Sequence, residues 1–294
     1  MGVIKTFSEF INESIWSDIQ DRSMGKTVRK EDIITTNEDL QKKIQELYKE
    51  QGEGETLDVS SLTNLIKCDD FSYLFSRLKE VKHIIGLEDW DVSNVKNMTG
   101  MFWGCKKFNS DLSKWDVSNV ENMYNMFVCC EKFNSNLSKW NVSSVVDMRG
   151  MFYNCENFNS DLSNWNVSSV GDMDSVFYNC SNFNSDLSNW NVNSVEYMGN
   201  MFDGCKKFNS DLSKWDVSNV QYMAYMFKGC INFNSDLSNW DVSNVKSMAF
   251  MFKGCENFNC DLSKWDVSIV KNMAGMFDDC KSLKQIPSWY YTHS

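Results

Sequence analysis

Histidine is the scarcest chemically active residue in this 294-residue chain, which contains only His83 and His293. Neither lies between residues 90 and 283, so Ser–His and Cys–His nucleophilic arrangements are excluded from that stretch. The eleven cysteines include no C-x-x-C pair, the spacing typical of zinc sites and redox centres. We therefore expect a protein that is not an enzyme and that holds no metal and no cofactor.

An excess of basic residues and long apolar runs are also absent. The formal net charge is -11 and the isoelectric point is near 4.8, which argues against nucleic acid as the main partner. Ser8, Glu9 and Asn12 interrupt the apolar runs near the N-terminus, so the sequence predicts neither a signal peptide nor a membrane span. These patterns leave a cytoplasmic and a virion-associated location open.

What the chain does contain is a repeat of 25 residues. Tryptophan and cysteine both recur at this interval without a slip, at Trp90, Trp115, Trp140, Trp165, Trp190, Trp215, Trp240 and Trp265, and at Cys105, Cys130, Cys155, Cys180, Cys205, Cys230, Cys255 and Cys280. A fixed period of this size predicts a solenoid, in which each unit buries its apolar face against its neighbours. Because Met and Phe flank the cysteines, we expect buried thiols rather than disulfides.

Residues 112–136 show the pattern within one unit. Trp115 and Val117 alternate with Lys114 and Asp116, which predicts a short strand. The apolar residues of 120–127 then follow helical spacing, and the preceding Ser118 is suited to cap a helix. Gly or Asn precedes the repeat cysteine in most units, which predicts that the helix ends there in a left-handed conformation.

Four segments are expected along the chain. Residues 1–35 contain an amphipathic helix and a linker; the apolar stripe of the helix, which either docks onto the first coil or anchors the chain in another subunit, is Phe7, Phe10, Ile11 and Ile15. Residues 36–89 form a helical cap, begun by Thr36, and a degenerate first repeat in which Leu57 replaces Trp90. The repeats occupy residues 90–283, and residues 284–294 form a C-terminal cap.

The repeat also resembles a known family. The string Trp-Asp-Val-Ser-Asn-Val, followed by Met-Phe-x-x-Cys-x-x-Phe-Asn, fills residues 90–283, and Leu112-x-x-Trp115-x-Val117-x-x-Val120 has leucine-rich-repeat spacing. This unit resembles the tandem repeat of BspA-like surface proteins and related mycoplasma lipoproteins. The resemblance implies a leucine-rich-repeat-like curved solenoid displayed for binding or adhesion. Residues 10–23 are similar to leaders on repeat proteins of gut Bacteroidales and their phages.

Together, the pattern and the resemblance predict an α/β solenoid. Its coils are expected to be right-handed, with a parallel sheet on one side, short helices on the opposite side and a helical cap at the N-terminal end. Residues that occupy the same position in successive units form a column along such a stack. The columns of Asn109 and Met98 are expected to be structural, through hydrogen bonds between coils and core packing respectively.

Candidate binding residues are those that vary between units or face solvent. The column two residues before the repeat cysteine is apolar in four units and charged in the next four; the apolar strip, which we expect to be an interface, is Trp103, Val128, Tyr153 and Tyr178. The exposed strand positions are nearly uniform, which suits a periodic ligand such as a glycan; they include Lys114, Asp116, Lys139 and Asn141. The Asp column that contains Asp116 is expected to hydrogen-bond backbone amides rather than hold calcium.

The leading hypothesis is a non-enzymatic repeat scaffold that binds a protein or a glycan, as a surface adhesin does. The alternative is a structural or host-recognition component of a phage virion, anchored to an assembly partner through residues 1–35.

Overall fold

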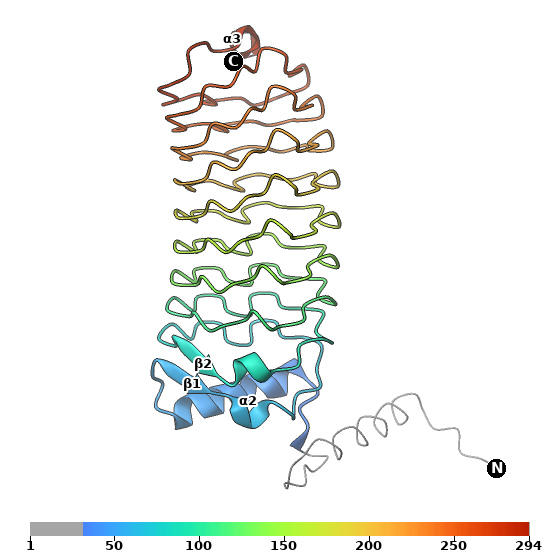
Figure 1. The fold of residues 1–294 in the computed structure, drawn as a ribbon, viewed down its shortest axis with the longest axis vertical. Helices are drawn as coiled ribbons and strands as arrows, with labels where there is room; N and C mark the ends of the chain where they lie inside the picture. The colour runs from blue at the N-terminus through green and yellow to red at the C-terminus, as the bar shows by residue number, and fades with distance from the viewer. Residues whose placement is uncertain (1–31, 294) are drawn as a thin grey trace, which may run out of the picture.

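The structure, a computed structural model, describes residues 32–293 as a stack of coils along one long axis (Figure 1). Helix α2, Asn37–Glu50, lies at the N-terminal end of the stack, and the short helix α3, Ser288–His293, lies at the other end. Between them the regular elements are strands β1, Thr56–Asp58, and β2, His83–Ile85, with single 3-10 turns at Ser60–Leu62 and Leu87–Asp89. The proposed N-terminal anchor residues, Phe7, Phe10, Ile11 and Ile15, lie outside the described residues.

Helix α2 confirms the helix predicted after Thr36. The Thr36 hydroxyl accepts a hydrogen bond from the backbone N–H of Asp39, as expected for an N-cap. Leu40 and Ile44 point into the core, and the helix covers the first coil. The side-chain amides of Asn37 and Gln41 both donate to the carbonyl oxygen of Ser72, at 3.0 and 2.9 Å, so α2 also satisfies backbone at the open end of the stack.

Strands β1 and β2 form a two-stranded parallel sheet that joins the cap to the first coil. Leu57 pairs with Ile84 in this sheet, and both side chains are buried. The predicted register placed Leu57 in the position of Trp90, which is six residues further along the chain than its actual partner. The similarity of the residues after Leu57 to those after Trp90 therefore does not correspond to equivalent positions in the stack.

The short helices expected in each unit are absent from residues 90–283, where the structure has consecutive tight turns. In one unit the N–H groups of Met101 and Cys105 donate to carbonyls three residues earlier, and Gly100 and Gly104 have φ values of 56° and 77°. A turn with positive φ at its third residue is of type II and cannot continue as a helix. The predicted left-handed position before the cysteine is confirmed, but a second one, four residues earlier, interrupts the expected helix.

The remaining N–H groups of these turns bind the next coil. Met98, Gly100, Phe102 and Gly104 donate to carbonyl oxygens 24 residues further along, at 2.7–2.9 Å. Successive coils are also joined by single parallel bridges, as between Asn97 and Asn122. We call the surface formed by residues 97–104 and their equivalents the ladder face. The parallel ladder was predicted at Trp115–Val117, but the structure has no strand there and places the backbone bonds on the ladder face.

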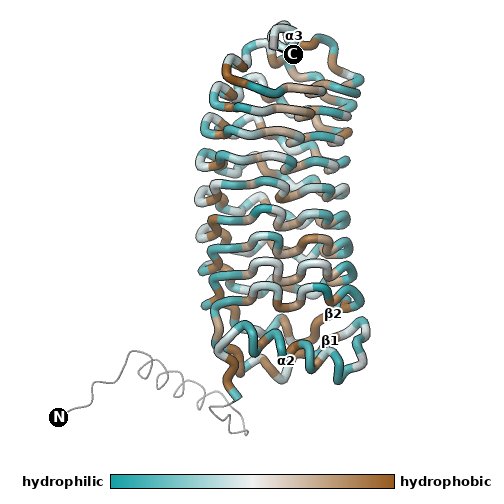
Figure 2. The backbone as a smooth tube through the Cα atoms, turned by 180° about the vertical axis from the view of Figure 1, so that it is seen from behind, coloured by the Kyte–Doolittle hydropathy of each residue, from teal (hydrophilic) through white to brown (hydrophobic). Residues whose placement is uncertain are grey.

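The core is a set of parallel columns of identical side chains. The Trp, Met and Phe columns are buried through the repeats. Within an aromatic column each ring stacks on the equivalent ring of the next coil; the ring centroids of Phe102 and Phe127, for example, are 5.4 Å apart. The thiol of Cys130 donates to the carbonyl oxygen of Phe102 in the preceding coil. Hydrophilic and hydrophobic residues alternate along each coil in Figure 2, as expected when each unit turns one set of side chains inward.

Polar side chains connect the coils where the backbone ladder does not. The amide oxygen of Asn109 accepts from the backbone N–H of Asn134, 25 residues later, at 2.8 Å. The hydroxyl of the buried Ser135 accepts from the N–H of Leu112 at 3.0 Å. These bonds recur along the stack, so the structural role predicted for the Asn109 column is confirmed.

Candidate ligand-binding surface

The predicted interface strip is divided into two separate aromatic pairs on the ladder face. Tyr153 and Tyr178 are half-buried and stack in parallel, with ring centroids 4.3 Å apart. Trp103 is 39% exposed, and its ring centroid lies 5.9 Å from that of Tyr73 in the preceding coil. Val128 lies between these pairs but is only 8% exposed, so the strip is not one continuous apolar surface.

The exposed residues predicted near the tryptophans have mostly local partners. Asp116 accepts a hydrogen bond from the backbone N–H of Ser118 at 3.1 Å, and Asn141 does the same with Ser143. The hydrogen bonds from Ser118 lower the pKa of the Asp116 carboxyl. These side chains stabilise turns, and Ser118 caps no helix. Lys114 and Lys139 are exposed on the same surface.

A pair of exposed tyrosines, missed from the sequence, lies further along the ladder face. The rings of Tyr197 and Tyr222 are 5.4 Å apart and only 5° from parallel, and they are 40% and 39% exposed. The column that contains them reads Asn or Asp in the four preceding units, at Asn97, Asn122, Asp147 and Asp172. The change from a small polar residue to tyrosine in two adjacent coils is the sequence signal that could have identified the pair.

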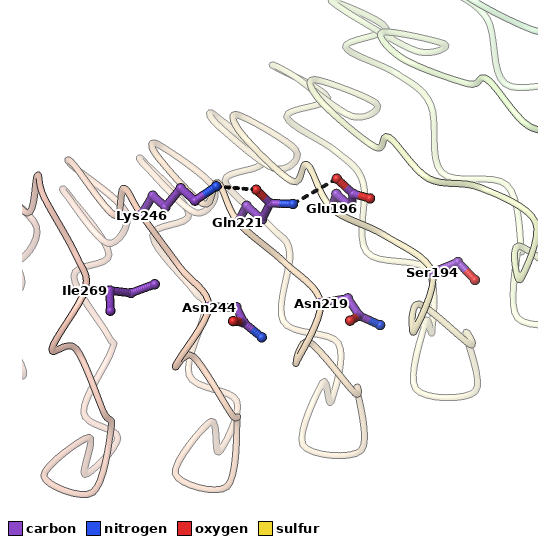
Figure 3. A pocket seen from close by; sticks show the side chains of 7 residues that line it. All are labelled: Ser194, Glu196, Asn219, Gln221, Asn244, Lys246 and Ile269. Carbon is purple, nitrogen blue, oxygen red and sulfur yellow. Dashed lines mark hydrogen bonds between the residues drawn. The ribbon is translucent and has the colours of Figure 1, made fainter.

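An open groove of about 520 Å³ runs over four successive coils (Figure 3). Tyr197 and Tyr222 each directly follow one of its lining residues in the chain. It is lined by two columns, Ser194, Asn219, Asn244 and Ile269 in one and Glu196, Gln221 and Lys246 in the other. Because equivalent residues of each coil contribute to it, the groove follows the axis of the stack. A ligand that lies in it would contact one residue pair for each coil that it crosses.

A chain of hydrogen bonds holds one wall of the groove. The Lys246 ammonium donates to the Gln221 amide oxygen at 2.6 Å, and the Gln221 amide nitrogen donates to the Glu196 carboxylate at 2.9 Å, as drawn in Figure 3. Lys246 also lies over the ring of Tyr222, 5.9 Å from its centroid. This lysine therefore connects the polar wall of the groove to the exposed tyrosine pair.

The opposite wall is fixed through the backbone. The amide nitrogen of Asn219 donates to the carbonyl oxygen of Asn193 at 2.6 Å, and that of Asn244 donates to Ser218 at 2.7 Å. Each bond crosses from one coil to the preceding one, which holds the carboxamide in one orientation. The groove thus presents amide and carboxylate oxygens, amide hydrogens and one ammonium group on a rigid frame.

Neither a metal cluster nor a membrane-crossing helix is found in residues 32–293. Within that part of the chain, no three His, Cys, Asp or Glu side chains are grouped so that they could hold a metal ion. None of the helices there is long and apolar enough to cross a bilayer.

The repeats match one family model, described as "Mycoplasma protein of unknown function, DUF285". It matches residues 69–190 and, in a second overlapping match, residues 172–290. The two matches together cover residues 69–290, or 222 of the 294 residues. No curated protein and no solved structure matches the chain. Since the match covers well over half of its length, including all the coils that form the groove, the chain belongs to this mycoplasma-type repeat family.

Proposed function

We propose that this protein is a non-enzymatic binding scaffold whose ligand is a glycan lying along the groove. The observation that carries the proposal is the exposed, nearly parallel stacked pair Tyr197 and Tyr222, whose members directly follow the groove residues Glu196 and Gln221 in the chain. Exposed aromatic rings that neighbouring coils stack in parallel form an apolar platform made of their outward ring edges. The groove beside that platform offers hydrogen-bonding groups along the axis of the stack.

This combination suits a sugar chain because a sugar ring has both kinds of surface. Its C–H groups pack against the exposed edges of the aromatic rings, while its hydroxyl groups donate to carboxylates and donate to or accept from amides at the rim. Neighbouring strands in a parallel ladder lie about 4.8 Å apart, so the groove repeats its polar groups at short, regular intervals. A polymer of similar units can use such a row of equivalent contacts better than an irregular protein surface can.

The organisation of the repeats supports a binding role. The constant columns are engaged in packing and coil-to-coil hydrogen bonds, as the Trp and Asn109 columns are. Residues that differ between units lie on the ladder face, in the groove and in the turn after the repeat cysteine, where a change does not disturb the core. The resemblance to BspA-like surface proteins favours the same role, in which a leucine-rich-repeat-like solenoid is displayed for adhesion.

The proposal is tested with the full chain and a panel of soluble polysaccharides, some neutral and some containing uronic acids. The double variant Tyr197→Ala/Tyr222→Ala should bind the recognised polysaccharide at least about tenfold more weakly than the wild type, because both halves of the platform are removed. Tyr291→Ala removes another exposed tyrosine, on α3, and should leave binding unchanged. The proposal fails if no polysaccharide binds the wild type, or if the double variant binds equally well.

A further inference from the structure

Two aromatic residues on the ladder face occupy a backbone position that favours glycine. Tyr225 has a φ of 61° and Phe250 a φ of 56°. In all the remaining repeats of residues 90–283 the same column holds a small residue, namely Gly100, Asn125, Gly150, Ser175, Asn200 and Gly275. Positive φ is readily adopted by glycine and tolerated by asparagine, whereas for a bulky aromatic residue it is a strained conformation.

Core packing does not account for this strain. Both rings are half-buried, and neither belongs to the hydrophobic core or to the apolar side chains that pack against it. The two rings stack on each other with centroids 5.2 Å apart. The Phe250 ring also lies over Gly275, so that a Cβ added to Gly275 would collide with the ring. Strained residues that contribute little to a core are concentrated at functional sites, where the strain accompanies a contact with a ligand.

The pair is continuous with the groove along the chain. Tyr225 follows Tyr222 by three residues in the same coil, and the N–H of Tyr225 joins the backbone ladder by donating to the carbonyl oxygen of Ala249. Both aromatic pairs therefore belong to the ladder face of neighbouring coils. Resting on the glycan-binding function proposed above, we propose that Tyr225 and Phe250 form a second platform for the same glycan, and that this glycan is uncharged.

The absence of charge in the ligand follows from the partners of the nearby lysines. Lys228 lies over Tyr225 at 5.4 Å and forms an ion pair with Asp203 at 3.1 Å. Lys253 lies over Phe250 at 5.5 Å and forms an ion pair with Asp278 at 3.5 Å. Lys246 is held by the chain of hydrogen bonds through Gln221 to Glu196. These three lysines thus already have acceptors within the chain, and a chain of net charge -11 repels a polyanion.

The test exchanges each aromatic residue for the asparagine found in the same column. The variant Tyr225→Asn/Phe250→Asn should bind the recognised neutral polysaccharide at least about tenfold more weakly while its melting temperature stays equal or rises, because strain is relieved. The matched control is Tyr73→Asn, since Tyr73 has a φ of 55° in the first coil and lies over Gly100 as Phe250 lies over Gly275. It should change stability in the same direction and leave affinity unchanged.

Four results overturn the inference. An unchanged affinity in the double variant removes the second platform, even when Tyr197→Ala/Tyr222→Ala still abolishes binding and the proposed function stands. A fall in melting temperature that accompanies the loss of affinity assigns the rings to packing. Weaker binding by Tyr73→Asn assigns the loss to a general effect on the ladder face. Equal or tighter binding of a uronic-acid polysaccharide overturns the assignment of an uncharged ligand. If the wild type binds no polysaccharide, the proposed function itself fails.

Discussion

The indole nitrogen of Trp165 donates a hydrogen bond to the backbone carbonyl oxygen of Leu137, in the preceding coil, at 3.0 Å. The same bond recurs along the stack, and Trp289 of helix α3 makes it with Leu262 although it lies one residue out of the 25-residue period. Each of these tryptophans therefore both fills the core and satisfies backbone that the ladder face does not reach.

Replacing Trp165 by alanine should destabilise the protein by about 3 to 5 kcal/mol, since the change removes a large buried ring and leaves the Leu137 carbonyl without its donor. Ring stacking with Trp140 and Trp190 is lost at the same time. Chemical denaturation of the purified variant measures the effect. Trp103→Ala is the control: because Trp103 is exposed, it should cost far less, and equal losses in the two variants would contradict the packing described.

The buried serine column should tolerate cysteine better than alanine. The Ser185 hydroxyl accepts from the N–H of Leu162 at 2.8 Å, so Ser185→Ala leaves that N–H buried without an acceptor and should cost about 1 to 3 kcal/mol. Cys260 stands in the same column and accepts from Leu237 at 3.2 Å. Ser185→Cys should accordingly lose less than the alanine variant in the same denaturation assay, and the reverse order would be inconsistent with this role.

The thiols should react with a thiol reagent in two groups. Burial raises the pKa of Cys105 to about 12, and the other buried members of its column are raised in the same direction, which suppresses the reactive thiolate. Cys129, Cys260 and Cys280 are half-buried, so a reagent should reach them in the folded protein, and the eight buried cysteines should react only after denaturation. Within the first group Cys260 and Cys280 should react slowly, because burial raises their pKa to about 11 and about 12. Mass spectrometry of labelled peptides separates the groups, and Cys129→Ser should remove one early equivalent.

The stability of the protein should fall in acid. Backbone hydrogen bonds from the serine two residues later lower the pKa of Asp186 and Asp211 below the ordinary aspartate value of 3.8. A group with a lowered folded pKa stabilises the fold above its unfolded pKa, and that stabilisation is lost as the pH falls below about 3.8 through the folded value. Burial raises the pKa of Asp172 and Asp203, so at these two residues the contribution to stability has the opposite sign and increases as the pH falls.

Asparagine variants provide the control for this pH dependence. Asn136 occupies the column of Asp186 and Asp211 and makes the same bond to the N–H of Ser138, at 3.0 Å. Changing Asp161, Asp186, Asp211 and Asp236 together to asparagine should keep the turns and flatten the acid part of a stability curve measured by urea unfolding between pH 2 and pH 7. An unchanged acid slope in this variant would show that other groups cause the loss.

Inward columns and polar coil-to-coil contacts could be predicted from the sequence because both depend on period alone. The burial of the Trp and Cys columns and the hydrogen bonds of the Asn109 column follow from a residue that returns every 25 positions. The left-handed residue before the cysteine was also identified, since Gly and Asn favour it. The assignment to an α/β solenoid of the leucine-rich-repeat class, with its handedness, stays a prediction.

The spacing of apolar residues alone could not show that the repeats lack helices. Val120, Met123, Met126 and Phe127 follow helical spacing and all point inward, but two residues with positive φ, such as Asn125 and Cys129, break the segment into turns. The first of these columns contains Tyr and Phe as well as Gly, which hid its conformation. Tyr225 and Phe250 were missed as binding candidates for the same reason, because residues unsuited to positive φ gave no sign of a common backbone position.

The direction of the hydrogen bonds on the ladder face has an electrostatic consequence. The four ladder N–H groups of each coil all point toward the next coil on the C-terminal side, as the N–H of Phe102 does in donating to the carbonyl oxygen of Met126. One bond per coil runs the other way: the carbonyl oxygen of Lys96 points toward the next coil and accepts from the N–H of Glu121. Peptide dipoles of about 3.5 D therefore add along the axis, as in a helix, with the negative pole beside α2 and the positive pole at the last coil.

The first and last members of one column carry charges that oppose these poles. Arg77 stands at the carbonyl pole and Asp279 at the amide pole, and both have positive φ like Gly104 between them. Two stacks would attract each other in head-to-tail order, with the amide pole of one molecule facing the carbonyl pole of the next. Because α2 covers the carbonyl pole through Asn37 and Gln41, the Ser72 carbonyl at that end is already bonded within the chain.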